Sequence, residues 1–259
     1  SPVRVGGFLS DFRLDPLKFR IPPRQMETSD PLQYMVLDAA DQALRDAGYD
    51  ARPFNRRRAA VIVGTMFCND FMRNLTVALQ YPEFERELQR ILRERAFSEK
   101  SIRNILSAAH KAFHKCKPML QDETGSFSAS TLASRVARTL DLMGGAFSLD
   151  AEEASSGAAL DCAMALLRSG ACDMVLCAGA QRAMDVGIYE EYALRGLITA
   201  VDAGFLPAEG TGVVLLKRAA EARRDGDPIR AIIKDVRSEI KDGRFTPDSV
   251  AGQMGHALG

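Results

Sequence analysis

An acidic pair, Glu152 and Glu153, stands between a short apolar run and a helix rich in small residues, within FSLDAEEASSGAALDCAMALLR at residues 147–168. A tight turn from a strand into a helix can present one side chain to a pocket beside the helix N-terminus. The residue at this turn is Glu153, which makes it the first candidate for chemistry. The alternative is that both glutamates are only favourable first-turn acids of a structural helix, where the helix dipole stabilises them.

The other reactive residue types are sparse. His110 and His114 are four residues apart on one predicted helix and could ligate a metal, but no carboxylate or thiol is clearly placed to complete the site. A surface histidine pair is therefore the favoured interpretation, and no metal is expected. The five cysteines show no metal-ligand spacing and are expected to be reduced thiols of a cytoplasmic protein: Cys68, Cys116, Cys162, Cys172 and Cys177.

The overall composition is that of an ordinary globular protein. The 259 residues are 46% hydrophobic, and 34 basic residues balance 34 acidic ones. A net charge of zero gives no sign of a nucleic-acid partner or an anionic membrane surface. No apolar run approaches the roughly 20 residues of a membrane span. We therefore expect a cytoplasmic protein without nucleic-acid or membrane partners.

Hydrophobic periodicity predicts the elements that must position the acidic pair. Short apolar runs predict buried strands at 59–63, 146–149, 173–178, 212–217 and 229–236. Helical patterns occupy 32–47, 128–140, 186–194 and 219–225, besides the helix after the acidic pair. Residues 83–115 predict a charged helical hairpin with a break at Phe97–Ser98. Strands that alternate with helices predict a layered α/β core.

Four segments resemble one family, the β-ketoacyl-acyl-carrier-protein synthases, or ketosynthases. DPLQYMVLDAADQALRDAGYD looks like the family's DPQQR-type helix, and RRRAAVIVGT looks like the strand that follows it. LRSGACDMVLCAGAQ resembles an LRSGECD-type turn and strand, and FLPAEGTGVVLLKRAAEARRDGDPIRAII resembles the GEG-G-VVLKR hairpin with its DGD-I turn. The segments follow family order over roughly residues 8–236.

The resemblance implies a thiolase-like fold with α-β-α-β-α layers, of which the second half is largely absent from this chain. Residues 1–236 would form the ketosynthase-like N-terminal half, with residues 83–125 as a peripheral helical insertion. Residues 237–259 would be a remnant or a disconnected piece of the C-terminal half.

The family carries a VDTACSS-type motif, and an ungapped match to LDAEEASSGAAL puts Glu153 at the position of the nucleophilic cysteine. Asp150, Ser155 and Ser156 match their family counterparts. Condensation needs a soft nucleophile that can hold an acyl chain as a thioester. Acyl transfer to Glu153 would instead give a mixed anhydride, which water would destroy.

The family's two catalytic histidines are also incomplete in this chain. No HGTGT-type motif is present. SVAGQMGHALG resembles the family's KSN-GH-type motif, with His256 at the histidine and Ala251 where the lysine would stand. A histidine without both partners is a weakened apparatus for proton transfer and oxyanion stabilisation.

The resemblance therefore implies a non-condensing ketosynthase homologue like a chain-length factor of a polyketide or polyunsaturated fatty acid synthase. Such a subunit would pair with an active ketosynthase and shape the acyl tunnel, with Phe147, Ser155 and Ser156 at the tunnel or the dimer interface. Acyl chains would arrive on the phosphopantetheine arm of an acyl carrier protein, and no bound cofactor is expected. The alternatives are a loading-type ketosynthase that decarboxylates malonyl-carrier protein and a purely structural docking domain.

Overall fold

The computed structural model describes residues 6–66, 70–116, 128–182, 186–196, 198, 207–241 and 244–256. The described helices are α1 (Pro16–Phe19), α2 (Pro23–Thr28), α3 (Leu32–Asp46), α4 (Asp70–Glu94), α5 (Glu99–Cys116), α6 (Ser130–Thr139), α7 (Ser155–Arg168), α8 (Val186–Leu194) and α9 (Ala219–Arg224), with a 3-10 turn, η1 (Arg56–Arg58). The described strands are β1 (Ala59–Gly64), β2 (Ala146–Leu149), β3 (Met174–Gln181), β4 (Gly210–Lys217), β5 (Ala231–Lys241) and β6 (Arg244–His256).

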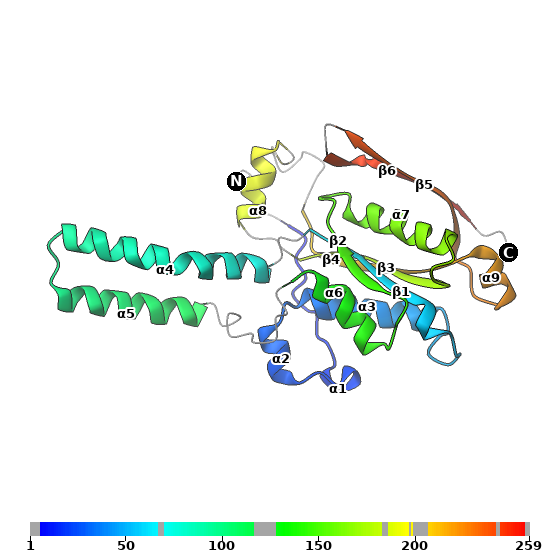
Figure 1. The fold of residues 1–259 in the computed structure, drawn as a ribbon, viewed down its shortest axis with the longest axis horizontal. Helices are drawn as coiled ribbons and strands as arrows, with labels where there is room; N and C mark the ends of the chain where they lie inside the picture. Colours follow the sequence, from blue (N-terminus) through cyan, green and yellow to red (C-terminus); the bar gives the residue numbers. More distant parts are fainter. Residues whose placement is uncertain are drawn as a thin grey trace.

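A four-stranded sheet in the order β2-β1-β3-β4 lies at the centre of the molecule (Figure 1). Strand β1 is parallel to β2 and β3, and β4 is antiparallel to β3. Every residue of β1 is buried, as its continuous apolar sequence AAVIVG predicts for a strand with helices on both faces. The strands predicted from 59–63, 146–149, 173–178 and 212–217 are all confirmed, and the last two are longer than predicted.

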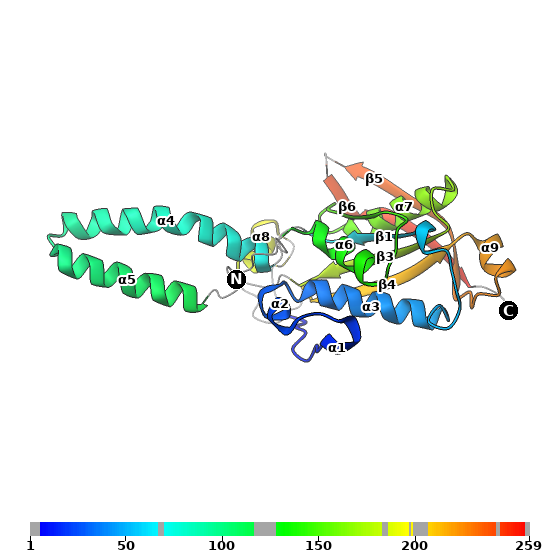
Figure 2. The same ribbon diagram turned by 60° about the horizontal axis from the view of Figure 1, so that its bottom comes forward.

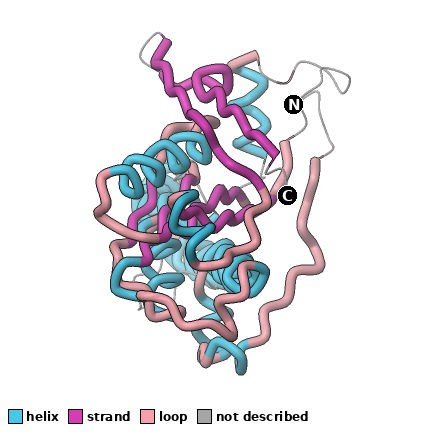
Figure 3. Tube along the Cα trace, turned by 90° about the vertical axis from the view of Figure 1, so that its right-hand side faces the viewer, coloured by secondary structure: helices cyan, strands magenta, loops and turns pink. Residues whose placement is uncertain are grey.

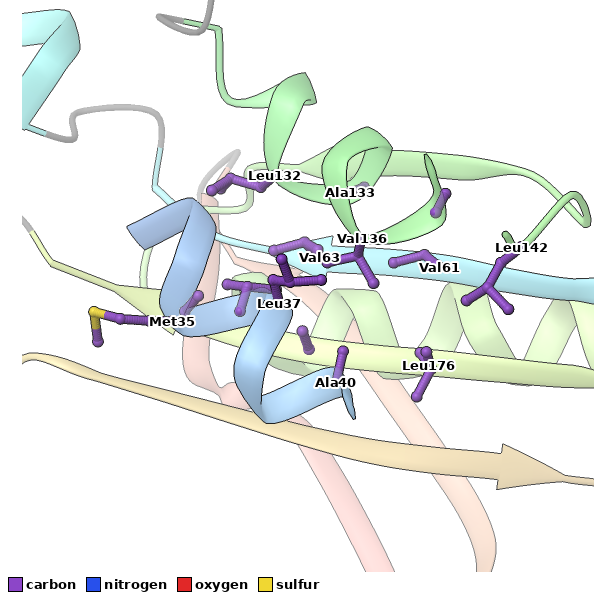
Figure 4. Close-up of a cluster of buried hydrophobic side chains, with 14 of the residues drawn as sticks. Met35, Leu37, Ala40, Val61, Val63, Leu132, Ala133, Val136, Leu142 and Leu176 are labelled. Carbon is purple, nitrogen blue, oxygen red and sulfur yellow. The ribbon is translucent and has the colours of Figure 1, made fainter. Parts of the chain in front are cut away.

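Helices α3 and α6 cover one face of this sheet, and α7 covers the other. Figure 4 shows side chains from α3, α6, the segment after α6, β1 and β3 in the larger core; those labelled are Met35, Leu37, Ala40, Val61, Val63, Leu132, Ala133, Val136, Leu142 and Leu176. Alternate residues of β1, Ala60 and Ile62, point to the opposite face and pack with Ala159 and Ala163 of α7. Small residues on α7 let the helix approach the strands closely.

The ribbon of β5 and β6 forms a further layer, because β5 packs against α7 (Figures 1 and 3). The order of layers is thus α3 with α6, the central sheet, α7, and the β5–β6 ribbon. This is a mixed α/β arrangement that agrees with the predicted thiolase-like layering. Strand β5 runs without a break across residue 236, where the sequence suggested a boundary. The interpretation of residues 237–259 as a separate piece stays a prediction.

The α4–α5 hairpin projects away from the layered body (Figures 1 and 2). The predicted break is confirmed, because α4 ends at Glu94 and α5 begins at Glu99. Ser98 caps α5 by accepting a hydrogen bond from the N–H of Ser101 at 3.1 Å. The hairpin is longer than predicted, since α4 begins at Asp70 and continues through Pro82. Residues 117–125 of the predicted insertion lie outside the described residues.

The N-terminal segment returns to the start of β4. The N–H of Gly7 donates to the carbonyl of Pro207 at 3.0 Å, and the N–H of Glu209 donates to the carbonyl of Gly7 at 2.7 Å. Gly7 and Ala208 form a short parallel bridge there. Two segments far apart in the sequence are therefore joined immediately before β4. Within the described residues, no helix is long and apolar enough to cross a membrane.

Candidate functional site

The turn between β2 and α7 is held by its own side chains. The carboxylate of Asp150 accepts a hydrogen bond from the N–H of Glu152 at 2.8 Å. The hydroxyl of Ser155 accepts from the N–H of Ala151 at 2.9 Å and donates to the carbonyl of Glu152 at 2.6 Å. These three bonds hold Glu152 at a φ of 51°, a left-handed conformation that costs free energy for a residue with a Cβ. The predicted strand-turn-helix geometry at Glu153 is therefore present.

Helix α7 begins after the two glutamates, which were expected to lie in its first turn. Helix α7 starts at Ser155 and has no acidic residue in its first turn. Glu152 and Glu153 precede the helix, so the expectation that they are first-turn acids was wrong. The reason is the left-handed residue, because Glu152 cannot be part of a right-handed helix at that φ.

The first turn of α7 packs closely against β1 and β3. A Cβ at Gly64, the last residue of β1, would lie 2.2 Å from the carbonyl oxygen of Ser155. A Cβ at Gly179 in β3 would lie 2.8 Å from the Cβ of Ser156. Both positions therefore require glycine for the observed approach. The sheet and the turn together leave little freedom in where Glu153 is placed.

Glu153 is paired with Arg195, which follows α8. The Nη1 atom of Arg195 lies 2.7 Å from Oε1 of Glu153, and its Nη2 atom donates to Oε2 at 3.3 Å. The Oε1 atom is buried and accepts no well-directed hydrogen bond, so the shorter contact is an ion pair rather than an aligned hydrogen bond. The side chain of Glu153 is 16% exposed and that of Arg195 is 25% exposed.

Arg195 also contacts Glu152 at 3.3 Å and Glu191 at 3.5 Å. Burial lowers the pKa of Arg195. The hydrogen bond and charge of Glu153 and the charges of the other two glutamates raise it, and together they outweigh burial, so the pKa of Arg195 is raised above its usual value. Arg195 therefore keeps its charge and offsets that of Glu153. The sequence analysis missed Arg195, because its local pattern shows only an ordinary pair with Glu191 four residues earlier.

A cavity of about 1540 Å³ adjoins the turn, with Glu152 and Glu153 in its lining. Its further walls include Leu160 of α7, Val214 of β4 and Ile232 of β5. More of the cavity wall is apolar than polar, although charged residues such as Lys217, Arg218 and Asp227 also line it away from the glutamates. An apolar chain could lie along such walls, but the polar end of the site offers a paired carboxylate instead of a nucleophile.

The other predicted site residues differ in their exposure to solvent. Ser155 is 4% exposed and is used to fasten the turn, whereas Ser156 is exposed beside Gly179. Phe147 lies in β2, at the edge of the described sheet, and is 40% exposed. The backbone of His256 is at the end of β6, opposite Ala231 of β5. The side chain of His256 is not among those described, so its relation to Glu153 stays a prediction.

The remaining reactive residues lie apart from the turn. The rings of His110 and His114 are 4.4 Å apart between centroids, on the projecting hairpin. In the described part of the chain, no group of three or more histidine, cysteine or acidic side chains could hold a metal ion. Burial raises the pKa of Cys177 to about 12 and also raises the pKa values of Cys162 and Cys172. These three thiols are therefore poor nucleophiles.

Comparison with curated proteins gives relatives among large synthases. The chain is 31% identical over 242 residues to the pikromycin polyketide synthase component PikAIII of Streptomyces venezuelae, which covers 89% of this chain and 13% of that protein. It is 28% identical over 261 residues to one subunit of the polyunsaturated fatty acid synthase of a Thraustochytrium species, covering 96% of this chain and 9% of that protein. The chain therefore spans only a small part of these relatives.

Comparison with solved structures also gives ketosynthase domains. A ketosynthase from module 6 of the bacillaene synthase of Bacillus subtilis, in a mutant form, matches with a TM-score of 0.62 at 25% identity, covering 88% of this chain and 33% of that chain. An oxazolomycin ketosynthase domain from Streptomyces albus matches with a TM-score of 0.61 at 24% identity, covering 88% of this chain and 36% of that chain. The family described as "Beta-ketoacyl synthase, N-terminal domain" matches residues 1–222. The layered fold and this match show that the chain belongs to the β-ketoacyl synthase N-terminal domain family.

Proposed function

We propose that this chain is the N-terminal half of a non-condensing ketosynthase-like subunit, similar in role to a chain-length factor. The observation that carries the proposal is the ion pair of Glu153 and Arg195 at the turn between β2 and α7. Glu153 stands where the resemblance places the nucleophilic cysteine. A carboxylate neutralised by a guanidinium cannot hold an acyl chain as a thioester. The turn keeps its strained backbone geometry, and Glu153 takes the place of the thiol that the resemblance would put there.

No described thiol replaces the missing nucleophile. Cys162 is on α7, nine positions beyond Glu153, and burial raises its pKa. Cys177 is buried in β3 beneath that helix, and its pKa is about 12. A thiol with such a pKa is almost wholly protonated near pH 7, and the thiolate is the nucleophilic form. These observations support a role without condensation.

The role we propose needs a partner. A cysteine-bearing ketosynthase of the same pathway would form a dimer with this protein in the cytoplasm, and both would receive acyl chains from an acyl carrier protein. The dimer contact would use β2, because Phe147 is exposed on this edge strand and β2 pairs only with β1 among the described strands. The apolar cavity beside Glu153 supports a contribution to the acyl tunnel.

Co-purification tests this proposal. The full-length protein, co-expressed with the cysteine-bearing ketosynthase of its pathway, is expected to elute as a complex that makes product. A Phe147→Asp variant should lose the complex because it places a charge in the contact, whereas Leu17→Asp is the matched control at an exposed leucine of α1. A stable monomer that shows no affinity for the ketosynthase would contradict the proposal.

A second candidate is decarboxylation of malonyl-carrier protein, and Arg195 is the observation that favours it. The negative charge of Glu153 would oppose an enolate in the same pocket, and the adjacent guanidinium offsets part of that charge. This candidate predicts release of carbon dioxide from malonyl-carrier protein and a changed rate in Glu153→Ala. Glu152→Ala is the control, since its more exposed carboxylate contacts the same arginine. Absence of release from the full-length protein would exclude it.

A further inference from the structure

Helix α4 carries a continuous stripe of large apolar side chains. The members of the stripe are separated by four, three, four and three residues: Val77, Tyr81, Phe84, Leu88 and Ile91. This alternation places all five on one side of the helix and is the spacing of a coiled-coil seam. Such a stripe is fully buried only when neighbouring helices cover its whole width.

Helix α5 covers only half of the stripe. Tyr81 stacks on Phe113 of α5 with ring centroids 4.2 Å apart, and both Tyr81 and Leu88 are partly buried. The other members of the stripe are 40%, 57% and 40% exposed: Val77, Phe84 and Ile91. The hairpin stands away from the layered body in both views, so no other described element covers this row (Figures 1 and 2).

The seam between the two helices fixes their register. The stacked rings make residue 81 level with residue 113. Nearer the tip, Leu92 and Ile102 are 9% and 0% exposed, which makes them level with each other. In this antiparallel register, Phe84 is level with the space between Ala108 and Ala112.

The two alanines lie on the same side of the hairpin as Phe84. At about 100° per residue, Phe84 is turned by about 60° from the seam on α4, and the alanines are turned by about 80° to 120° from the seam on α5, toward the same side. Both alanines are exposed. One face therefore combines large side chains on α4 with small ones on α5. We call this face, made by Val77, Phe84, Ile91, Ala108 and Ala112, the hairpin face.

Opposite charges border the hairpin face. Exposed glutamates follow its α4 margin: Glu83, Glu87 and Glu94. Exposed lysines follow its α5 margin: Lys111 and Lys115. Arg90 pairs with Glu87 at 3.0 Å and with Glu94 at 2.6 Å, which leaves the α4 margin with a net negative charge. The face is thus acidic along one edge and basic along the other.

We propose that the hairpin face binds one amphipathic α-helix of a partner protein, so that three helices form a bundle. Residues 77 to 91 span about 21 Å along α4, so the partner helix needs about 15 residues or more. Its apolar side would carry large aliphatic residues at the same four-three spacing, and those over α5 would pack above the alanines. Its basic edge would lie over α4 and its acidic edge over α5.

A single helix fits this face better than the hairpin of a second copy. Setting acidic margins against basic ones with a second hairpin would require a two-fold axis along the hairpin. That axis would make the two layered bodies overlap, because each body extends beyond the hairpin on both sides (Figures 1 and 2). A lone helix has the same complementary charges without this clash. The contact uses no residue of the turn at Glu153, so it is independent of the function proposed above.

Fluorescence anisotropy with a labelled peptide tests this contact on the full-length protein. The probe is a peptide of about 21 residues in heptads, with leucine at the first and fourth positions, lysine along one edge and glutamate along the other. It should bind, whereas a peptide of the same composition with shuffled leucines should not. Phe84→Asp should raise the dissociation constant by about tenfold or more, because it places a charge at the centre of the contact. Leu79→Asp is the matched control, since Leu79 is 74% exposed on the other side of α4.

A second peptide tests the role of the charged margins. With glutamate along both edges, it should bind about threefold to fivefold more weakly, since one of its edges must face the glutamates of α4. The double variant Glu87→Lys with Glu94→Lys should reverse the preference between the two peptides. A variant that keeps the original preference would show that the partner helix does not have the charges we propose.

Cross-linking locates the bound helix. The first peptide, carrying a maleimide at its centre, should react with the introduced thiol of Ala108→Cys and not with that of Leu79→Cys, as mass spectrometry of the digested product would show. Absence of binding, or binding that Phe84→Asp leaves unchanged, would overturn the proposal. Self-association of the full-length protein that Phe84→Asp abolishes would also overturn it, because a second copy would then cover the face.

Discussion

The turn at Glu153 and the α4–α5 hairpin are stabilised in different ways. The turn is short and strained. Its conformation depends on hydrogen bonds that Glu152 makes with the side chains of Asp150 and Ser155, and on the packing of two strands against α7. The hairpin is long and regular, and its charged side chains are exposed to solvent. A strained turn is maintained only where its surroundings determine it, whereas a helical hairpin depends on its own seam. Substitutions in the two regions should therefore differ sharply in their effects on stability.

The largest expected effect is at the contact between β1 and the turn. Gly64→Ala would place a Cβ 2.2 Å from the carbonyl oxygen of Ser155, and backbone atoms on both sides must shift. We expect the free energy of unfolding to fall by roughly 3 kcal/mol or more in urea titration. Gly212→Ala in β4 is the matched control, because a Cβ there would meet nothing within 4 Å. Equal effects of the two substitutions would show that the turn is not tightly packed.

A smaller loss is expected when the cation at the turn is removed. Arg195→Met leaves Glu153, which is 16% exposed, without its partner. The free energy of unfolding should fall by about 1 to 2 kcal/mol, since a mostly buried carboxylate loses its compensating charge. The double variant Glu153→Gln with Arg195→Met should recover most of that loss. If the double variant is as unstable as the single one, the ion pair is not the cause.

The smallest effect is expected on the hairpin. Arg93→Gln breaks the ion pair with Glu99, in which both side chains are more than half exposed, at 55% and 57%. Solvent screens such a pair, so the urea midpoint should not change measurably. The same titration that detects Gly64→Ala provides the comparison. A loss as large as that of Arg195→Met would mean that the hairpin is coupled to the layered body.

The regular elements of the body were largely predictable because their buried positions are occupied by apolar residues in the pattern that is typical of a strand or a helix. Strand β1 is a continuous apolar run, and the strand predicted at 146–149 has those bounds in the structure. The beginning of α4 was not predicted, because Pro82 interrupts the helical pattern from within the helix. Strand β6 also escaped prediction, since its glycines and polar residues show no clear alternation.

The site was only half predictable. The turn and its central residue, Glu153, follow from local sequence and from the resemblance to the ketosynthase motif. Arg195 is 42 residues further along the chain, and nothing in its neighbourhood indicates a partner at the turn. The left-handed conformation of Glu152 was also missed, because the residue type gives no sign of it. Long-range pairing and backbone strain arise from tertiary structure, which the local sequence pattern does not indicate.

The bridge between Gly7 and Ala208 has a consequence for the order in which the molecule folds. Its two hydrogen bonds join segments that enclose nearly the whole described chain before β4. Contacts of such large sequence separation close slowly, because a long loop must be ordered first. During synthesis, the backbone of Gly7 has no bridge partner until residues 207–209 have left the ribosome. The amides of Gly7 and Glu209 should therefore become protected from hydrogen exchange together, after the strands β1, β2 and β3 have paired.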